Sequence, residues 1–245
     1  MQKATDRDLI SLSLSFSFCC GRGAYVFIIH IQCGYNGAII ESNIAHQMEI
    51  SMELLKKRIR EDARIKDGHI IKVDSFLNHQ VDIQLLDEIG KEFKRLFDGE
   101  QITKIITIEA SGIAIACLTA KYFNVPIVFA KKSESKNIDG EVYRTTVTSY
   151  TRGKDYTVIL EKRYLSSDDR VIIIDDFLAT GEAQRGLLDI CSQAGAEISG
   201  IGVVIEKGFQ GGGDKLRAAG YNVQSLAIVD SLENGEIMFR ETSID

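Results

Sequence analysis

The sequence predicts an α/β protein with a doubly wound, mainly parallel sheet that is flanked by helices. Three observations lead to this prediction. Short apolar runs recur from residue 104 onward, they are apolar throughout rather than alternating, and segments with helical spacing separate them. Strands with this pattern are typical of a parallel sheet that is buried on both faces.

Two segments with helical spacing precede the first apolar run. Residues 53–62 and 82–97 place apolar side chains three or four positions apart, which predicts an amphipathic helix in each. Residues 72–80, between these helices, fit neither the helical nor the strand period. The sequence therefore predicts no regular element there.

Strands and helices then alternate along the chain. The predicted strands are 104–108, 125–130, 171–174, 198–205 and 223–229. The predicted helices are 112–123 and 183–194. Residues 133–155 interrupt this order with a polar stretch followed by alternating residues from Val142 to Tyr150. They predict a hairpin with a flexible loop, which is either an active-site lid over 133–145 or a plain surface excursion.

Composition narrows the kind of ligand that the protein can bind. With 44% hydrophobic and 26% charged residues, the chain has the composition of a globular protein. Its net charge of -6 gives no general attraction to nucleic acid or to an anionic membrane, so any phosphate must be held by a local site. Cys117 and Cys191 lie in apolar helical patterns, which predicts core thiols in a reducing cytoplasm.

The first 51 residues differ from the rest. Glycine-containing stretches at 21–23 and 32–37 interrupt the apolar runs before they reach the about 20 residues of a membrane helix. Asp6 and Asp8 make a secretory signal the weaker alternative. We interpret residues 1–51 as an extension, translated from a misplaced start, and residues 52–245 as the functional domain beginning at Met52. A native N-terminal peptide that starts at Met1 would refute this interpretation.

The most informative segment runs from Val171 to Ala183. It has the pattern of a buried strand that ends in Asp175 and Asp176, followed by a tight turn that opens a helix. Ligands collect at the carboxyl ends of such strands, and a helix N-terminus offers free N–H groups to an anion. The turn can therefore wrap a phosphate while the two carboxylates accept hydrogen bonds from sugar hydroxyls. The alternative is that both acids merely cap the helix and favour its dipole.

This segment resembles the diphosphoribosyl-binding motif of the type I phosphoribosyltransferases. The resemblance implies their fold, with a small base-binding hood and a flexible hairpin loop beside the sheet. It also implies that Asp175 and Asp176 bind the ribose hydroxyls. Phe177 departs from the usual aliphatic residue, and Thr180 stands where relatives often have Asn. The implied 5-phosphate loop consists of Ala179, Thr180, Gly181, Glu182 and Ala183.

Further stretches resemble bacterial xanthine phosphoribosyltransferases, namely residues 73–80, 109–114, 128–132 and 205–210. This resemblance implies transfer of the 5-phosphoribosyl group from 5-phosphoribosyl-1-diphosphate (PRPP) to xanthine, in purine salvage, by a homodimer. It implies that Ile71 and Asn78 contact the purine and that Lys207 lies against its oxygenated edge. Without the resemblance, Asn78 reads as a turn residue and Lys207 as a solvated charge.

The diphosphate is expected at a second helix start. The backbone N–H groups of Ser111 and Gly112 can cradle it, although the same residues also suit an ordinary strand-to-helix turn. Lys131 and Lys132 directly follow a strand and can neutralise the leaving group, whereas paired lysines are more often a solvated surface.

Magnesium is the expected cofactor. The resemblance implies that Mg²⁺ bridges the sugar hydroxyls and the diphosphate, mainly through PRPP oxygens and water. We predict no metal site formed by protein side chains alone, because His69 and His79 have no Cys or His partner at metal spacing.

Two other functions stay open at this point. The first is a phosphoribosyltransferase for another base, such as guanine, hypoxanthine, adenine or orotate. The second is a non-catalytic regulator that senses PRPP and binds DNA through an added domain. Against the regulator, residues 1–51 hold only Lys3, Arg7 and Arg22 beside four acids, which is no basic recognition helix. Against an ATPase, the sequence has no Gly-Lys-Ser or Gly-Lys-Thr loop.

Overall fold

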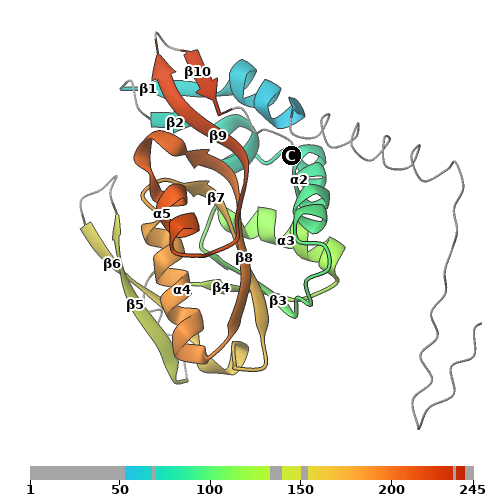
Figure 1. Cartoon of the computed structure of the whole chain (residues 1–245), viewed down its shortest axis with the longest axis vertical. Coiled ribbons are helices and arrows are strands. Elements are labelled where there is room, and N and C mark those ends of the chain that lie inside the picture. Colours follow the sequence, from blue (N-terminus) through green and yellow to red (C-terminus); the bar gives the residue numbers. More distant parts are fainter. Residues whose placement is uncertain (1–52, 68–69, 133–139, 150–153, 234–235, 241–245) are drawn as a thin grey trace, which may run out of the picture. The chain divides into compact units, whose positions relative to one another are not determined.

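The apolar runs of the sequence form a six-stranded sheet at the centre of the protein (Figure 1). The computed structural model describes residues 53–67, 70–132, 140–149, 154–233 and 236–240. The strands of the sheet are β3 (Lys104–Ile108), β4 (Ile127–Ala130), β7 (Arg170–Leu178), β8 (Glu197–Lys207), β9 (Val223–Glu233) and β10 (Glu236–Phe239). Their order is β10-β9-β8-β7-β3-β4, and only β10 is antiparallel to its neighbour. The predicted parallel sheet is confirmed.

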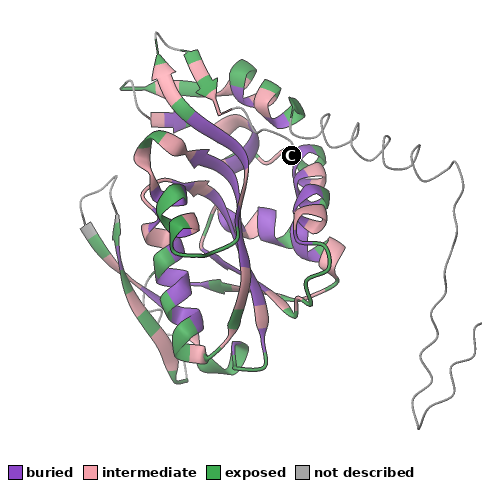
Figure 2. Cartoon of the chain, in the orientation of Figure 1, coloured by how far each residue is buried: buried purple, intermediate pink, exposed green. Residues whose placement is uncertain are grey.

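Helices cover both faces of this sheet. Because successive side chains of a strand point to opposite faces, β7 contributes to two cores. Ile172 and Ile174 pack with residues of α2 (Ile83–Leu96) and α3 (Gly112–Phe123). Val171 and Ile173 pack on the other face with α4 (Glu182–Ala194) and Leu216 of α5 (Gly212–Ala218). Figure 2 shows the resulting buried sheet between two layers that are exposed on their outer sides.

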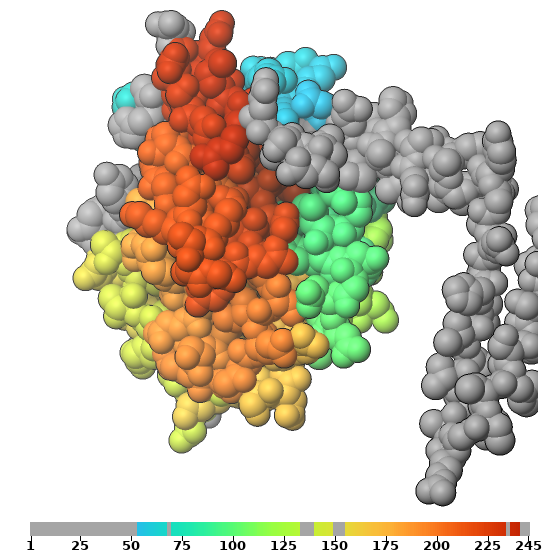
Figure 3. Space-filling view, viewed as in Figure 1, coloured from blue at the N-terminus to red at the C-terminus, as the bar shows by residue number. Residues whose placement is uncertain are grey.

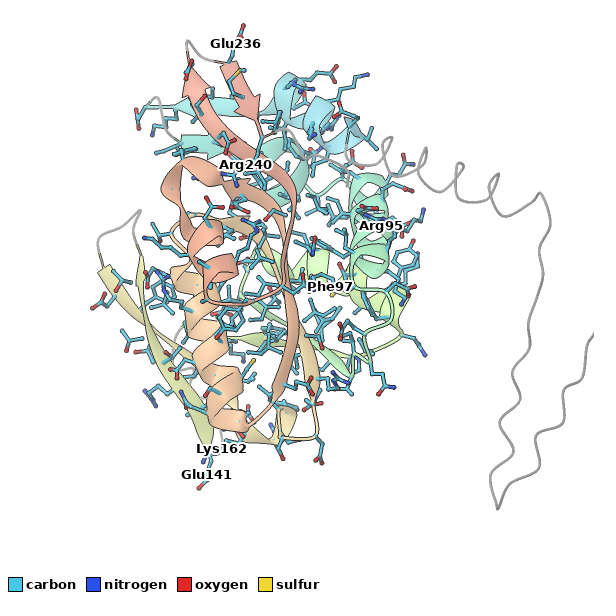
Figure 4. The ribbon with its side chains drawn as sticks, in the orientation of Figure 1. Arg95, Phe97, Glu141, Lys162, Glu236 and Arg240 are labelled. Atoms are coloured by element: carbon cyan, nitrogen blue, oxygen red, sulfur yellow. The ribbon has the colours of Figure 1, made fainter. Side chains whose placement is uncertain are left out.

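The predicted hairpin is also present. Strands β5 (Val142–Ser149) and β6 (Lys154–Glu161) pair antiparallel and lie along α4. Lys162 and Glu141 form an ion pair of 3.0 Å at its base, where both are labelled in Figure 4. Residues 133–139 and 150–153 fall outside the described residues, so the predicted lid stays a prediction.

A small layer stands at the end of the sheet where β9 and β10 lie (Figure 1). It contains a helical stretch at 53–62, the antiparallel pair β1 (Arg64–Lys66) and β2 (Ile70–Lys72), and the π-helix η1 (Asp74–Asn78). Within residues 72–80, Asp74–Asn78 thus form a helical element, which the sequence pattern missed. We call residues 53–67 and 70–78 the hood. Its side chains Ile71, Phe76 and Leu77 are buried in the same core as α2 and α3.

The strand that carries the two acids extends further than predicted. It does not end at Asp175 and Asp176 but continues to Leu178, because β8 supplies partners as far as Glu206. On its other side, the ladder with β3 ends at the pair Ile106 and Ile173. The acids therefore lie beyond the last pair of the β3–β7 ladder.

One of the two predicted core thiols is not in the core. Cys191 is buried in α4, as predicted, whereas Cys117 is exposed on α3. The buried positions of α3 are Gly112, Ile115, Ala116, Thr119 and Ala120, and residue 117 lies outside that stripe. No helix in the described part of the chain is long and apolar enough to cross a lipid bilayer.

Candidate active site

The order of the strands creates a crevice between β3 and β7. From β3 the chain passes through α3 to β4 at one edge, and from β7 it passes through α4 to β8 on the opposite side. The two helices cover opposite faces, so the loops that follow β3 and β7 diverge at the carboxyl ends of these strands. Ligands of open α/β sheets bind in the crevice at such a reversal of strand order.

The loop after β7 is shaped for an anion. Gly181 has a φ of 87°, a left-handed conformation that glycine adopts without steric cost, and α4 begins at the next residue. No side chain of the described structure caps the start of α4, so its first N–H groups are free for a phosphate. Arg185 donates to the carbonyl oxygen of Thr180 at 3.0 Å and pairs with Glu182. The predicted loop Ala179–Ala183 is thereby held together without its N–H groups being used.

Asp175 is almost fully enclosed. Its Oδ1 accepts the main-chain N–H of Asp176 at 3.0 Å, and its Oδ2 accepts the amide Nε2 of Gln184 at 2.9 Å. Burial, and then the negative charge of Asp176, raise the pKa of Asp175 well above its ordinary value, while Lys132 acts in the opposite direction. Gln184 was not predicted as a site residue. Its only sequence signal is its place in the first turn of α4.

Asp176 lies toward a different partner. Burial lowers the pKa of Lys207 from its ordinary value, and the negative charge of Asp176 opposes that change. The ammonium of Lys207 stands 5.2 Å from the ring centroid of Phe177. Lys207 is half-buried at the end of β8, next to β7 in the sheet. Lys132 thus acts on the charge of Asp175, and Asp176 acts on the charge of Lys207.

The loop after β3 approaches Asp175 closely. A Cβ on Gly112 would lie 3.2 Å from Oδ1 of Asp175 and would overlap the hydroxyl of Thr107. Only glycine fits at this start of α3, where Ser111 makes no side-chain cap. The peptide bond between Glu109 and Ala110 is cis. The predicted diphosphate loop and the predicted ribose-binding acids are therefore neighbours.

The two lysines after β4 differ in their attachment. The backbone of Lys131 pairs with Ile159 of β6 through two hydrogen bonds of 2.9 Å. The main-chain N–H of Lys132 donates to the carboxylate of Glu109 at 2.6 Å, which ties it to the diphosphate loop. The ammonium of Lys132 lies 5.4 Å from the ring centroid of Tyr156. Lys132 is thus held beside the crevice by its contact with Glu109, whereas Lys131 is held by its backbone pairing with β6.

The predicted base-binding residues Ile71 and Asn78 belong to the hood. Ile71 is only 4% exposed and packs in a core to which Phe177 also contributes. Asn78 ends η1, and its Oδ1 is buried with no hydrogen-bond partner among the described residues. An unpartnered buried acceptor is costly unless a ligand or water satisfies it. A separate hollow of about 770 Å³, lined by residues such as Leu54, Ile83 and Lys121, contains none of the predicted site residues.

Comparisons with known proteins show the family to which this chain belongs. Residues 72–224 match the family described as the phosphoribosyl transferase domain. The fold and the crevice therefore define a phosphoribosyltransferase. The xanthine phosphoribosyltransferase of Lachnoclostridium phytofermentans is 60% identical over 191 residues, which cover 77% of this chain and 98% of the relative. That of Ruminiclostridium cellulolyticum is 56% identical over 190 residues, 78% of this chain and 100% of the relative. The chain belongs to the xanthine phosphoribosyltransferases of this family.

Solved structures agree on the fold. Adenine phosphoribosyltransferase from Rhodothermus marinus superposes with a TM-score of 0.60 at 22% identity, over 74% of this chain and 99% of its own. The adenine enzyme from Giardia lamblia, complexed with 9-deazaadenine, gives a TM-score of 0.53 at 28% identity, over 59% of this chain and 79% of its own.

Proposed function

We propose that the protein transfers the 5-phosphoribosyl group of PRPP to xanthine, giving xanthosine 5'-monophosphate and diphosphate, as a step of purine salvage. The observation that carries this proposal is the meeting of two uncapped helix starts with Asp175 and Asp176 in one crevice. The relatives at 56% to 60% identity support xanthine as the base.

The crevice suits each part of the donor. The N–H groups of 179–183 would bind the 5-phosphate, and those of Ser111 and Gly112 the diphosphate. Asp175 and Asp176 would accept hydrogen bonds from the ribose hydroxyls. The bond from ribose C1 to the diphosphate oxygen breaks, and its electron pair leaves with the diphosphate. A base nitrogen that gives up its proton to solvent forms the new bond to C1. Lys131 and Lys132 would stabilise the departing negative charge.

The base would lie between the hood and the end of β8. Xanthine has two carbonyl oxygens and readily loses a proton, so the ammonium of Lys207 suits its oxygenated edge. The unpartnered Oδ1 of Asn78 offers an acceptor to a purine N–H. Ile71 would pack against the purine face from the hood. The amino group of adenine cannot accept a hydrogen bond from the ammonium of Lys207. The pocket should therefore favour xanthine over adenine.

Magnesium fits the residues that line the crevice. Carboxylate, phosphate and hydroxyl oxygens are the ligands that this ion prefers, and it usually keeps several waters. No group of three or more His, Cys, Asp or Glu side chains able to hold a metal occurs among the described residues. We propose that Mg²⁺ is held mainly by PRPP and water, near Asp175 and Asp176. When bound, it would supply positive charge against the diphosphate.

We further propose that residues 52–245 form the functional domain and that residues 1–51 are an extension. Relatives that are matched over 98% to 100% of their length correspond to only 77% to 78% of this chain, which supports this division.

The free thiols of Cys117 and Cys191 are typical of a reducing compartment and support a cytoplasmic location. We expect a homodimer, which light scattering of the purified protein would test.

Diphosphate release with a panel of bases tests the proposed reaction. We expect the highest kcat/KM with xanthine and lower values with guanine and hypoxanthine. A higher value with adenine or orotate would assign the enzyme to another base. Binding of PRPP without release in the presence of any base would make the protein a sensor rather than an enzyme.

A further inference from the structure

A buried ion pair lies behind the phosphate loop. The carboxylate of Glu206, on β8, is fully buried. Arg217 of α5 donates to both of its oxygens, at 3.0 and 2.6 Å. Ser225 of β9 donates its hydroxyl to the same carboxylate and accepts from Arg217 at 3.1 Å. A two-pronged contact of this kind fixes the orientation of both side chains.

The same carboxylate supports the start of α5. A Cβ on Gly213 would overlap the carboxylate of Glu206, so this helix start lies directly against it. One residue earlier, the N–H of Gly212 donates to the carbonyl oxygen of Ala179 at 3.1 Å. A Cβ on Gly212 would come within 2.5 Å of the carbonyl carbon of Thr180. The start of α5 therefore fills the space between Glu206 and the phosphate loop, with no room for a side chain.

Glu206 is also linked to both ends of the proposed site through the sheet. In the ladder between β7 and β8 it pairs with Leu178, the residue before Ala179. In its own strand it precedes Lys207, whose side chain points to the opposite face. A shift of this carboxylate would thus move the phosphate loop and the base-binding lysine together.

Arg240 forms further ion pairs on the outer side of α5. Arg240, labelled in Figure 4, pairs with Asp214 of α5 at 3.1 Å and with Asp230 of β9 at 2.9 Å. Arg217 also reaches Asp214 at 3.3 Å. In Figure 3 α5 and β9 belong to one face of the molecule. The network therefore spans β8, α5 and β9 behind the crevice, and Arg240 braces it from outside.

We propose that Glu206 and Arg217 are positioning residues, which hold the phosphate loop through the start of α5 and keep Lys207 in register with it. This inference rests on the proposed function of that loop and of Lys207. In this role, both residues act through the phosphate loop and Lys207 rather than by contact with a substrate. Buried ion pairs often add little net stability relative to apolar replacements, so we attribute this pair to geometry rather than to stability.

Two variants test the inference. Arg217→Lys keeps the positive charge but loses the two-pronged contact. The double variant Glu206→Gln with Arg217→Met removes both charges, so no unpaired charge is left buried to unfold the protein. For both we expect the KM for PRPP and the KM for xanthine to rise about tenfold, which is about 1.4 kcal/mol of binding free energy. We expect a smaller change in kcat, and for the double variant a melting temperature close to that of the parent.

Lys104→Met is the matched control. Lys104 and Asp169 form a half-buried ion pair of 2.8 Å at the opposite, amino ends of β3 and β7. We expect this variant to lose stability while both KM values stay unchanged. Parental KM values in both test variants would overturn the inference, as would equal KM changes in the control. If the parent protein neither binds PRPP nor releases diphosphate, the proposed function itself is wrong. If the parent is active but both variants keep its KM values, only the positioning role is wrong.

Discussion

Asp175 is held where its charge is unfavourable. The carboxylate is buried in β7 beside a second acid, and its two hydrogen bonds come from neutral donors, the N–H of Asp176 and the amide of Gln184. Residues that lower the stability of the free protein in this way are common at functional sites, where a ligand later supplies the missing partner. We therefore attribute the raised pKa of Asp175 to its role rather than to the needs of folding.

Replacement of Asp175 by Asn should raise the stability of the protein while it lowers the activity. Because its folded pKa is raised, Asp175 contributes its full stability below the ordinary value of 3.8, and this contribution is lost as pH rises through the folded pKa. We expect Asp175→Asn to increase the free energy of unfolding at pH 8 by about 1 kcal/mol. The gain should shrink as the pH falls. Urea unfolding at several pH values measures this, and an equal loss of stability at every pH would contradict it.

The same substitution should remove most of the activity. An acceptor that becomes neutral no longer stabilises the positive character of the ribosyl group, and we expect kcat to fall by about 100-fold or more. Thr103→Val offers a control, because its hydroxyl contacts Asp169 at the other end of the strands. We expect that variant to keep the parental kcat.

Lys207 should govern the choice of base. We expect Lys207→Ala to lower turnover with xanthine far more than it changes the affinity for PRPP. Burial lowers the pKa of this lysine below its ordinary value of 10.5. As the pH rises, kcat/KM for xanthine should therefore begin to decline before pH 10.5. Lys207→Arg should keep the charge and abolish that alkaline decline. An equal loss with every base would show that Lys207 has no part in base selection.

At this scale, the sequence predicted residues that a motif carries and missed residues whose contacts depend on how the helices pack. The acids and the phosphate loop are contiguous, and the structure places them in one crevice. Gln184, Glu206 and Arg217 were not predicted. Their contacts join residues 9 and 11 positions apart and depend on how α4 and α5 pack on the sheet.

The loop from β7 to α4 depends on one backbone conformation. Gly181 and Gly99 both have left-handed φ values, 87° and 83°, but Gly99 lies in the turn after α2 with nothing near its Cβ position. We expect Gly181→Ala and Gly99→Ala each to cost about 1 kcal/mol of stability. Only Gly181→Ala should raise the KM for PRPP. If both variants change this KM equally, the loop has no special role in binding the donor.

The elements themselves were predicted unevenly, for physical reasons. The buried strands and long helices have strong patterns, and all of those predicted occur. The end of β7 was misplaced because the partner strand β8, rather than the local sequence, extends it to Leu178. The short elements β1, β2, η1 and α5 were missed, since each depends on tertiary packing, and α5 begins with glycines.

The order of the strands explains why two segments that are distant in the sequence open onto one crevice. The chain leaves β3 and β7 in opposite directions, so the loops at 109–111 and 179–181 open onto the same crevice. The sequence predicted a parallel sheet and its ligand edge but not the order of the strands. That order depends on which strands pair in three dimensions, and it brings the start of α3 at Gly112 close to Asp175.

The central claim is that this crevice binds PRPP. Isothermal titration of the purified protein with PRPP in the presence of Mg²⁺ measures it most directly. We expect saturable binding at one site per chain, and at 100 times the Kd the ligand should stabilise the fold by about 2.7 kcal/mol. Absence of both heat and thermal stabilisation in a well-folded sample would contradict the account.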